Sequence, residues 1–275
     1  MRMKLFFMHI VFTSLFAFSQ TIHRTVSIPY YVSMNAYSAH QSDLFSISSN
    51  KAALAQMDNS CAGVFSERRF LLSSLNHFVA VIGLHAGHGN FGMNTGYFGF
   101  KDYNETKIGL AYAKKLGSKL DIGACFNFNS IKISGYGNSS AINGEIGILL
   151  HLTDKLHAGI NVFNPAGGKF GNDFNEKLAT VITVGSGYEA SERFFVSTEI
   201  EKEEDLPVNV NAGIQYKFLP QLFVRASIAT ETSTTYFGIG FIMKSFRMDV
   251  IASYHPQLGF TPAILLVFNF KSKQN

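Results

Sequence analysis

The chain has 275 residues and a formal net charge of +4, and its charged fraction of 15% lies below the roughly 25% of an average soluble domain. This charge is too small to indicate a nucleic-acid partner. Two cysteines, Cys61 and Cys125, are too few for a disulfide framework, and the sequence leaves open whether they form one bridge or stay as buried thiols.

Residues 1–20 have the pattern of a cleavable secretory signal. Arg2 and Lys4 precede the apolar run Leu5–Phe16, and Ala17-Phe18-Ser19 has the small-x-small form of a cleavage site. The run is shorter than the roughly 20 apolar residues of a bilayer span, which favours cleavage over a retained anchor. Removal of the signal would lower the formal charge from +4 to +2.

Residues 21–58 lack any strand pattern, whereas apolar and polar side chains alternate in successive segments of residues 59–275. In 208–217, for example, Val208, Val210 and Ile214 alternate with Asn209 and Gln215. A period of two is that of a β-strand with one apolar face. The segments are 60–69, 75–86, 90–101, 107–113, 122–129, 145–151, 156–162, 178–188, 193–202, 208–217, 221–230, 235–243, 246–254 and 259–270.

These segments predict an all-β protein, a transmembrane antiparallel up-and-down β-barrel of about 14 strands, with 12 as the alternative. A soluble sandwich would also alternate, but its outward rows should be charged, and here they are almost uninterrupted Ile, Val, Leu and Phe. Tight turns such as 153–155 alternate with longer connections, 134–140 and 164–176. Short periplasmic turns opposite longer outer loops are usual for bacterial barrels, so we expect a Gram-negative outer-membrane protein with periplasmic termini.

The run Ser49-Asn50-Lys51-Ala52-Ala53-Leu54-Ala55 resembles the Asn-Pro-Ala-x-Leu-Ala stretch near the start of FadL-type barrels and their PorV/PorQ relatives of Bacteroidota, with Lys51 in place of proline. Residues 162–166 and 206–240 are similar to the same group. The resemblance implies a fourteen-stranded barrel with residues 21–58 folded inside as a hatch, which would include Asn50, Ala52, Ala53 and Leu54. FadL members carry hydrophobic molecules across the outer membrane, and PorV-like members are components of type IX secretion.

The polar rows of the strands supply the candidate lumen residues. They form either a wall of paired charges that holds the hatch or a polar constriction that selects a solute. These residues are Glu145, His151, His157, Glu199, Glu201, Asn209, Asn211, Gln215, Lys217, Arg225, Arg247 and Asp249.

Sequence motifs for enzymatic or metal chemistry are weak. His85-Ala86-Gly87-His88 has no nearby Cys, Asp or Glu to complete a metal site, and no nucleophile is marked by its neighbours. We therefore expect no enzyme activity, no metal and no cofactor. The glycines of residues 83–99 fit places where strands bend or the hatch backbone comes close, and Gly92, Gly96 and Gly99 are the only candidates for a lateral opening.

The sequence favours a PorV/PorQ-like outer-membrane barrel that acts in transport or as a component of a type IX secretion-related assembly. The alternatives are a FadL-like passive channel for hydrophobic small molecules and a plugged scaffold that conducts nothing. The expected partners are outer-membrane lipid and either secretion-system proteins or a hydrophobic solute.

Overall fold

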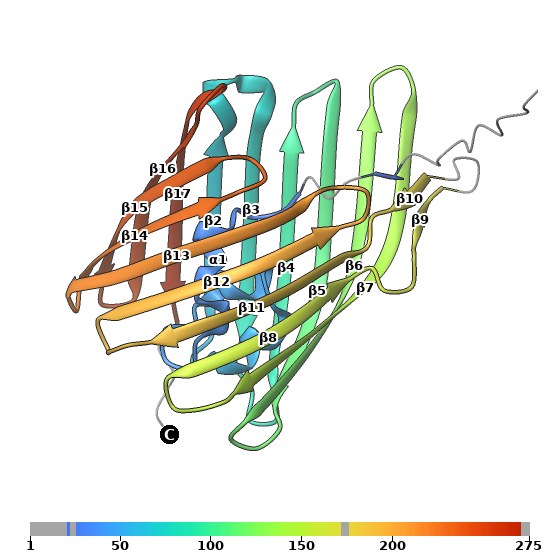
Figure 1. The fold of residues 1–275 in the computed structure, drawn as a ribbon. Helices are drawn as coiled ribbons and strands as arrows, with labels where there is room; N and C mark the ends of the chain where they lie inside the picture. The colour runs from blue at the N-terminus through green and yellow to red at the C-terminus, as the bar shows by residue number, and fades with distance from the viewer. Residues whose placement is uncertain (1–20, 23–25, 172–175, 271–275) are drawn as a thin grey trace, which may run out of the picture.

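The computed structural model describes residues 21–22, 26–171 and 176–270 (Figure 1). Within this part of the chain, fourteen strands form one closed barrel, in which the last strand pairs with the first. The predicted fold class and the strand number of fourteen are therefore confirmed, and the alternative of twelve is wrong. The barrel strands are β2 (Cys61–Arg68), β3 (Asn76–Leu84), β4 (Asn90–Gly99), β5 (Tyr103–Lys115), β6 (Leu120–Ile133), β7 (Gly137–His151), β8 (Leu156–Phe163), β11 (Val181–Glu189), β12 (Phe194–Glu203), β13 (Val208–Leu219), β14 (Leu222–Ala229), β15 (Thr234–Met243), β16 (Phe246–His255) and β17 (Gly259–Asn269).

Each barrel strand pairs antiparallel with its neighbours along the chain, and β17 closes on β2 from Ala263 opposite Glu67 to Asn269 opposite Cys61. We call the end with the turns after β2, β4 and β6 the upper end, as in Figure 1, and the end with the turns after β3, β5 and β7 the lower end. The predicted signal, residues 1–20, and the last residues of the predicted barrel domain, 271–275, lie outside the described residues.

Strands β5, β6 and β7 are longer than their alternation predicted. The predicted loop 134–140 is reduced to the turn 134–136, because Ile133 pairs with Gly137 and Ser130 pairs with Ser140. The first four residues of β7, 137–140, carry no apolar side chain on either face, so the ladder continues beyond the apolar band without the alternation that marks a half-buried strand.

The connection between β8 and β11 forms a small sheet of its own. In it β10 (Glu176–Leu178) pairs with β9 (Lys169–Phe170) and, in parallel, with β1 (Thr21–Ile22). Phe170 and Leu178 are buried against Phe163 and Val181 of the barrel strands. Residues 21–22 thus lie in this small sheet and outside the helical segment that follows.

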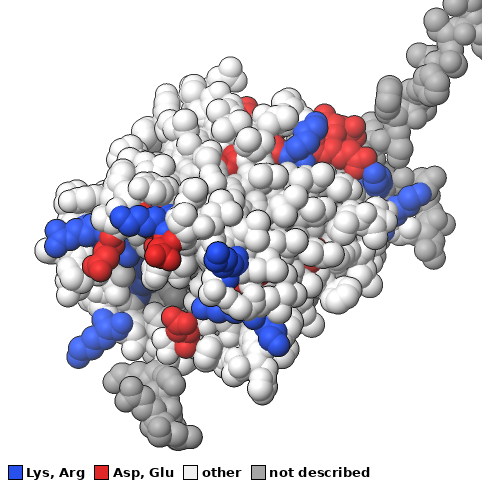
Figure 2. All heavy atoms as spheres, turned by 60° about the horizontal axis from the view of Figure 1, so that its bottom comes forward, with Lys and Arg blue, Asp and Glu red and all other residues white. Residues whose placement is uncertain are grey.

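The outer face of the barrel is apolar. On β6, Ile122, Phe126 and Phe128 are exposed, while the alternating Asp121 and Asn127 are buried inside. Figure 2 shows that charged side chains gather near the ends of the barrel and leave the visible side wall almost free of them. An exposed apolar belt around a closed barrel fits lipid and not water, which excludes the soluble sandwich considered from the sequence.

Residues 26–57, which we call the inner segment, lie within the barrel. They form four short helical turns, α1 (Tyr30–Ser33), η1 (Met34–Tyr37), η2 (Leu44–Ser48) and η3 (Lys51–Gln56). These turns contact strands on all sides: η1 contacts β8, β11 and β12, η2 contacts β2 and β3, and η3 contacts β4 to β7. Among the described residues, none of the helices is long and apolar enough to cross a bilayer.

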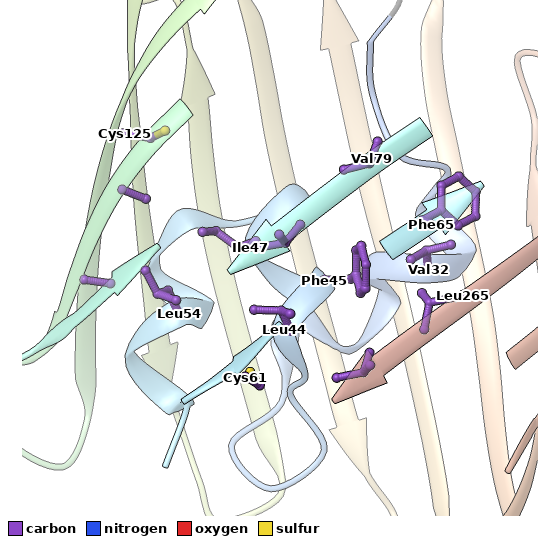
Figure 3. Close-up of a cluster of buried hydrophobic side chains, with 14 of the residues drawn as sticks. Val32, Leu44, Phe45, Ile47, Leu54, Cys61, Phe65, Val79, Cys125 and Leu265 are labelled. Atoms are coloured by element: carbon purple, nitrogen blue, oxygen red, sulfur yellow. The ribbon is translucent and has the colours of Figure 1, made fainter. Parts of the chain in front are cut away.

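The main hydrophobic core therefore sits in the lumen. Figure 3 shows Phe45 and Ile47 of the inner segment among side chains of the wall, including Phe65, Val79 and Leu265. Burial of a large apolar side chain contributes about 1.5–3 kcal/mol, so this core fixes the inner segment to one part of the wall.

Candidate functional site

The structure places all of the predicted lumen residues on the inward face of their strands. On β13, Asn211 and Gln215 are buried, whereas Val210 and Ile214 between and beside them are exposed. Lys217 of the same row is half-buried. Whether these residues select a solute stays a prediction, but most of them bind the inner segment or each other.

Asp43 is the centre of a buried ion cluster. It accepts hydrogen bonds from Arg247, at 2.7 Å, and from Arg225, at 3.1 Å, and Arg247 also pairs with Asp249. Burial alone would raise the pKa of Asp43, but the guanidinium groups of Arg247 and Arg225 outweigh it and hold this pKa below its usual range. The cluster ties the start of η2 to β14 and β16, and Gln215 extends it through a 2.6 Å hydrogen bond from Arg225.

A second cluster surrounds Glu145 on β7. Lys51 Nζ lies 3.2 Å from Glu145 Oε1, and both side chains are only 1% exposed. Lys51 Nζ also donates to the Ile47 carbonyl oxygen, and Asn161 Nδ2 donates to Glu145 at 2.8 Å. Lys107 approaches the same carboxylate at 3.9 Å. A lysine in place of the proline of the motif thus binds the wall directly.

The predicted hatch residues belong to η3. Asn50 caps this turn, because its side chain accepts from the Ala52 amide, and it also donates to the Ile148 carbonyl oxygen of β7 at 2.9 Å. Ala52, Ala53 and Leu54 are buried. The short side chains let the η3 backbone lie against the wall.

Two tyrosines attach the first turns to β12. Tyr37 donates to Glu199 at 2.8 Å, and Tyr30 shares a 2.6 Å hydrogen bond with Ser197. Glu199 also accepts a hydrogen bond from Asn211 Nδ2, at 3.4 Å. The inward side chains of β12 therefore hold α1 and η1 of the inner segment in place.

Inward glycines make room for the inner segment. A Cβ at Gly123 would lie 2.4 Å from the Lys51 carbonyl, and one at Gly147 would lie 2.3 Å from Asn50 Oδ1. The prediction that the hatch backbone approaches glycines was limited to residues 83–99. There Met57 covers Gly83 and Leu54 covers Gly92, but sequence reasoning missed Gly123 and Gly147 on later strands.

A cavity lies on each side of the inner segment, and each has a volume of about 400 Å³. The upper cavity is bounded by residues 27–30 of the inner segment and by strand residues that include the predicted Glu199, Glu201, Asn209 and Asn211. The lower cavity is bounded by residues of the inner segment and of the β5–β6 and β7–β8 hairpins. Its polar lining includes His40, Gln56, Lys119, Asp121, His151 and His157.

The lower mouth holds a hydrogen-bonded group that sequence reasoning largely missed. Glu189 at the end of β11 accepts hydrogen bonds from the Ser38 hydroxyl and the Ala39 amide. Asp121 of β6 accepts from Gln56. Glu189 lies one residue beyond the predicted segment 178–188, and the inward parity that Asp121 shares with Gly123 was the signal that could have identified Asp121.

The strand considered for a lateral opening is intact. β4 pairs without interruption with β3 from Phe91 to Gly99 and with β5 from Asn90 to Gly99. Gly92 and Gly96 are covered from inside by Leu54 and Val26, so their lack of a side chain serves packing. The lateral opening is not present in this structure.

Cys61 and Cys125 are both free and buried, which settles the question left open by the sequence. His85 of the His-x-x-His motif contacts the Met57 carbonyl oxygen and Asn90. Within the described ranges, no group of three or more His, Cys, Asp or Glu side chains is arranged to hold a metal ion.

No protein-family model matches the sequence, and a search of curated proteins gave no match. Solved structures do match. The toluene transporter TbuX of Ralstonia pickettii has a TM-score of 0.61 and 12% identity, over 90% of this chain and 100% of that chain. The toluene transporter TodX of P. putida gives 0.60 and 12% over the same shares.

The CymD monoaromatic hydrocarbon channel has a TM-score of 0.58 and 14% identity, over 91% of this chain and 100% of that chain. This chain has the fold of these channels. All three are named as channels or transporters and none as an enzyme. The more specific resemblance to the PorV/PorQ group receives no support from these matches.

Proposed function

We propose that the chain is an outer-membrane channel of the FadL type for small hydrophobic molecules, with the inner segment as its hatch. The observation that carries the proposal is the division of one barrel lumen into two cavities of about 400 Å³ by a single segment of the same chain. Displacement of that segment would join the cavities. The fold shared with three hydrocarbon channels supports a hydrophobic solute over a secreted protein as the cargo.

A plugged scaffold is the second candidate, because the inner segment is tied down by buried ions. Asp43 and Lys51 both bind wall residues, and such contacts are costly to break one at a time. A role beside type IX secretion proteins would belong to this candidate. Outer-membrane lipid is the partner in either case.

Uptake in cells tests the channel directly. We expect a Gram-negative host that lacks its own FadL-type channels to accumulate a labelled monoaromatic hydrocarbon faster when it carries this protein. Host cells with the empty vector are the control, and resistance of the barrel to unfolding in cold detergent verifies its assembly. Equal accumulation in both strains, together with no measurable conductance of the purified protein in a planar bilayer, would support the scaffold instead.

The orientation is a separate proposal, with the upper end outside the cell and the termini in the periplasm. Cysteines introduced at Tyr136, which is 89% exposed, and at Asp205 should react with a membrane-impermeant maleimide in intact cells. Cysteines at Ser118 and Asp154 of the lower end should react only after the outer membrane is opened. The unaltered chain is the control, because its two thiols are buried. The reverse labelling pattern would invert the orientation. Asp173, a labelling position in the predicted connection 164–176, lies outside the described residues.

A further inference from the structure

Carboxylates dominate the charged side chains around the upper cavity. Among the described residues, five glutamates border this cavity but only one lysine or arginine, Arg69, which pairs with Glu67 at 2.8 Å. Three of the glutamates, Glu199, Glu201 and Glu203, alternate along the inward face of β12. Side chains two residues apart on a strand point the same way, roughly 7 Å from each other. One strand therefore presents a row of carboxylates to the cavity.

The upper cavity reaches the upper end of the barrel. Leu206, Thr232 and Leu258 border it and belong to the upper-end turns that follow β12, β14 and β16. A solute that enters from this end therefore meets the cavity before it meets the inner segment. A cleft that is lined by charge of one sign and has walls of low dielectric concentrates solutes of the opposite sign.

Two buried hydroxyl groups from separate parts of the wall also border the cavity. Thr183 of β11 is 3% exposed and Ser253 of β16 is 7% exposed, and both face inward. Within the part of the chain that the structure describes, neither hydroxyl has a hydrogen-bond partner. Buried polar groups are hydrogen-bonded in the great majority of cases. These two hydroxyls therefore mark places where a polar group of a bound solute can lie.

The same cavity has an apolar part. Tyr30, Phe70 and Tyr236 border it, together with Ile28 and Leu258. Aromatic rings pack against apolar bodies and attract cations to their faces. The volume of about 400 Å³ lies within the range of small-molecule sites, roughly 300–1,000 Å³. The lining thus suits a small molecule with one cationic end and one apolar end.

We propose that the upper cavity binds a small aromatic amine, with the protonated amine at the carboxylate row of β12 and the ring among the aromatic side chains. A carboxylate accepts hydrogen bonds and an ammonium group donates them, so the two are complementary. A hydrocarbon offers no donor to the carboxylates or to the hydroxyls of Thr183 and Ser253. The cavity therefore favours the amine over a hydrocarbon of the same size.

As a narrowing of the substrate class of the channel, this inference rests on the proposed function, but binding at the cavity is measured without transport. Binding of the amine without uptake of any solute would reject the channel and leave the site. Uptake of a hydrocarbon without a preference for the amine in binding would reject the site and leave the channel.

Calorimetry with the full-length protein in a non-ionic detergent tests the site, and protein-free micelles provide the blank. The probes are phenethylamine, the neutral phenethyl alcohol of similar shape, and the anionic phenylacetate. At neutral pH we expect phenethylamine to bind about tenfold more tightly than the alcohol, because charge-assisted hydrogen bonds are about twice as strong as neutral ones. Phenylacetate should not bind. High salt should weaken binding of the amine, since the cavity is open to solvent at the upper end.

Glu201→Gln removes the central charge of the row and keeps the size of the side chain. It should weaken binding of phenethylamine several-fold and leave binding of phenethyl alcohol unchanged. Glu204→Gln is the matched control, because Glu204 follows the same strand, pairs with Lys177 and does not border the cavity. Equal affinity for the amine and the alcohol, or amine binding that Glu201→Gln leaves intact, would overturn the proposal. The comparison of the three probes uses the unaltered chain, so it decides the question even where a variant does not assemble.

Discussion

Replacement of Gly147 by valine should unseat η3 from the wall and raise the conductance of the barrel. An added Cβ would lie 2.3 Å from Asn50 Oδ1 and 2.8 Å from the Lys51 amide nitrogen, so it meets the cap and the backbone of η3. Overpacking of this kind costs about 1–3 kcal/mol. We expect a lower unfolding midpoint in denaturant and more frequent open events in planar bilayers.

Gly144→Val is the matched control in the same strand. A Cβ at Gly144 meets no atom within 4 Å, and the next residue, Glu145, faces the lumen. This change should therefore alter stability by less than about 0.5 kcal/mol and leave conductance unchanged. If both variants behaved alike, close contact at Gly147 would not be what seats the inner segment.

The barrel could be predicted from the sequence because lipid touches only one face of each strand. Residues such as Ile122 and Phe126 must be apolar, while their neighbours Asp121 and Asn127 need not be, and this contrast repeats along each strand. Residues 137–140 of β7 extend beyond the apolar belt, so neither face of the strand has to be apolar there. The contrast disappears, and the strand was predicted too short.

The inner segment could not be predicted in the same way, because its side chains are buried on every side. Tyr31, Tyr37 and Phe45 have no exposed surface, so no period separates an inner from an outer face. The missing strand pattern of residues 21–58 and the short motif around Asn50 marked it. Asn50 is the N-cap of η3 and Lys51 its first residue, a position where proline is favoured in helices. The absence of proline therefore leaves the turn intact and adds a charge.

The partners of the lumen residues were also beyond the sequence. Parity identified Glu145, Arg225 and Arg247 as inward residues, but it carried no information about which group they face. Asp43 and Lys51, which bind them, lie far away in the chain and outside any repeating pattern. The paired wall considered from the sequence agrees with these contacts, whereas selection of a solute rests on experiments.

Glu145→Gln should destabilise the protein more than any other single change considered, by about 3–5 kcal/mol, because it removes the carboxylate partner of a buried lysine. Lys51 is 1% exposed and lies 3.2 Å from Glu145, so water cannot replace the lost charge without opening the interior. The free energy of unfolding in urea, measured on the protein in lipid vesicles, provides the test. Glu204→Gln is the control, because its pair with Lys177 is 35% exposed on both sides and should be worth about 0–1 kcal/mol.

The double variant Lys51→Met, Glu145→Gln separates the charge from the packing. Methionine fills a similar space without a charge, and replacement of a buried ion pair by apolar groups is often neutral. We therefore expect the double variant to recover most of the stability that Glu145→Gln loses. No recovery would mean that the hydrogen bonds of Glu145 to Asn127 and Asn161 hold η3 in place. Full recovery would mean that the ion pair positions the inner segment and adds little net stability. A weak net contribution of this kind is what the proposed displacement of the hatch requires.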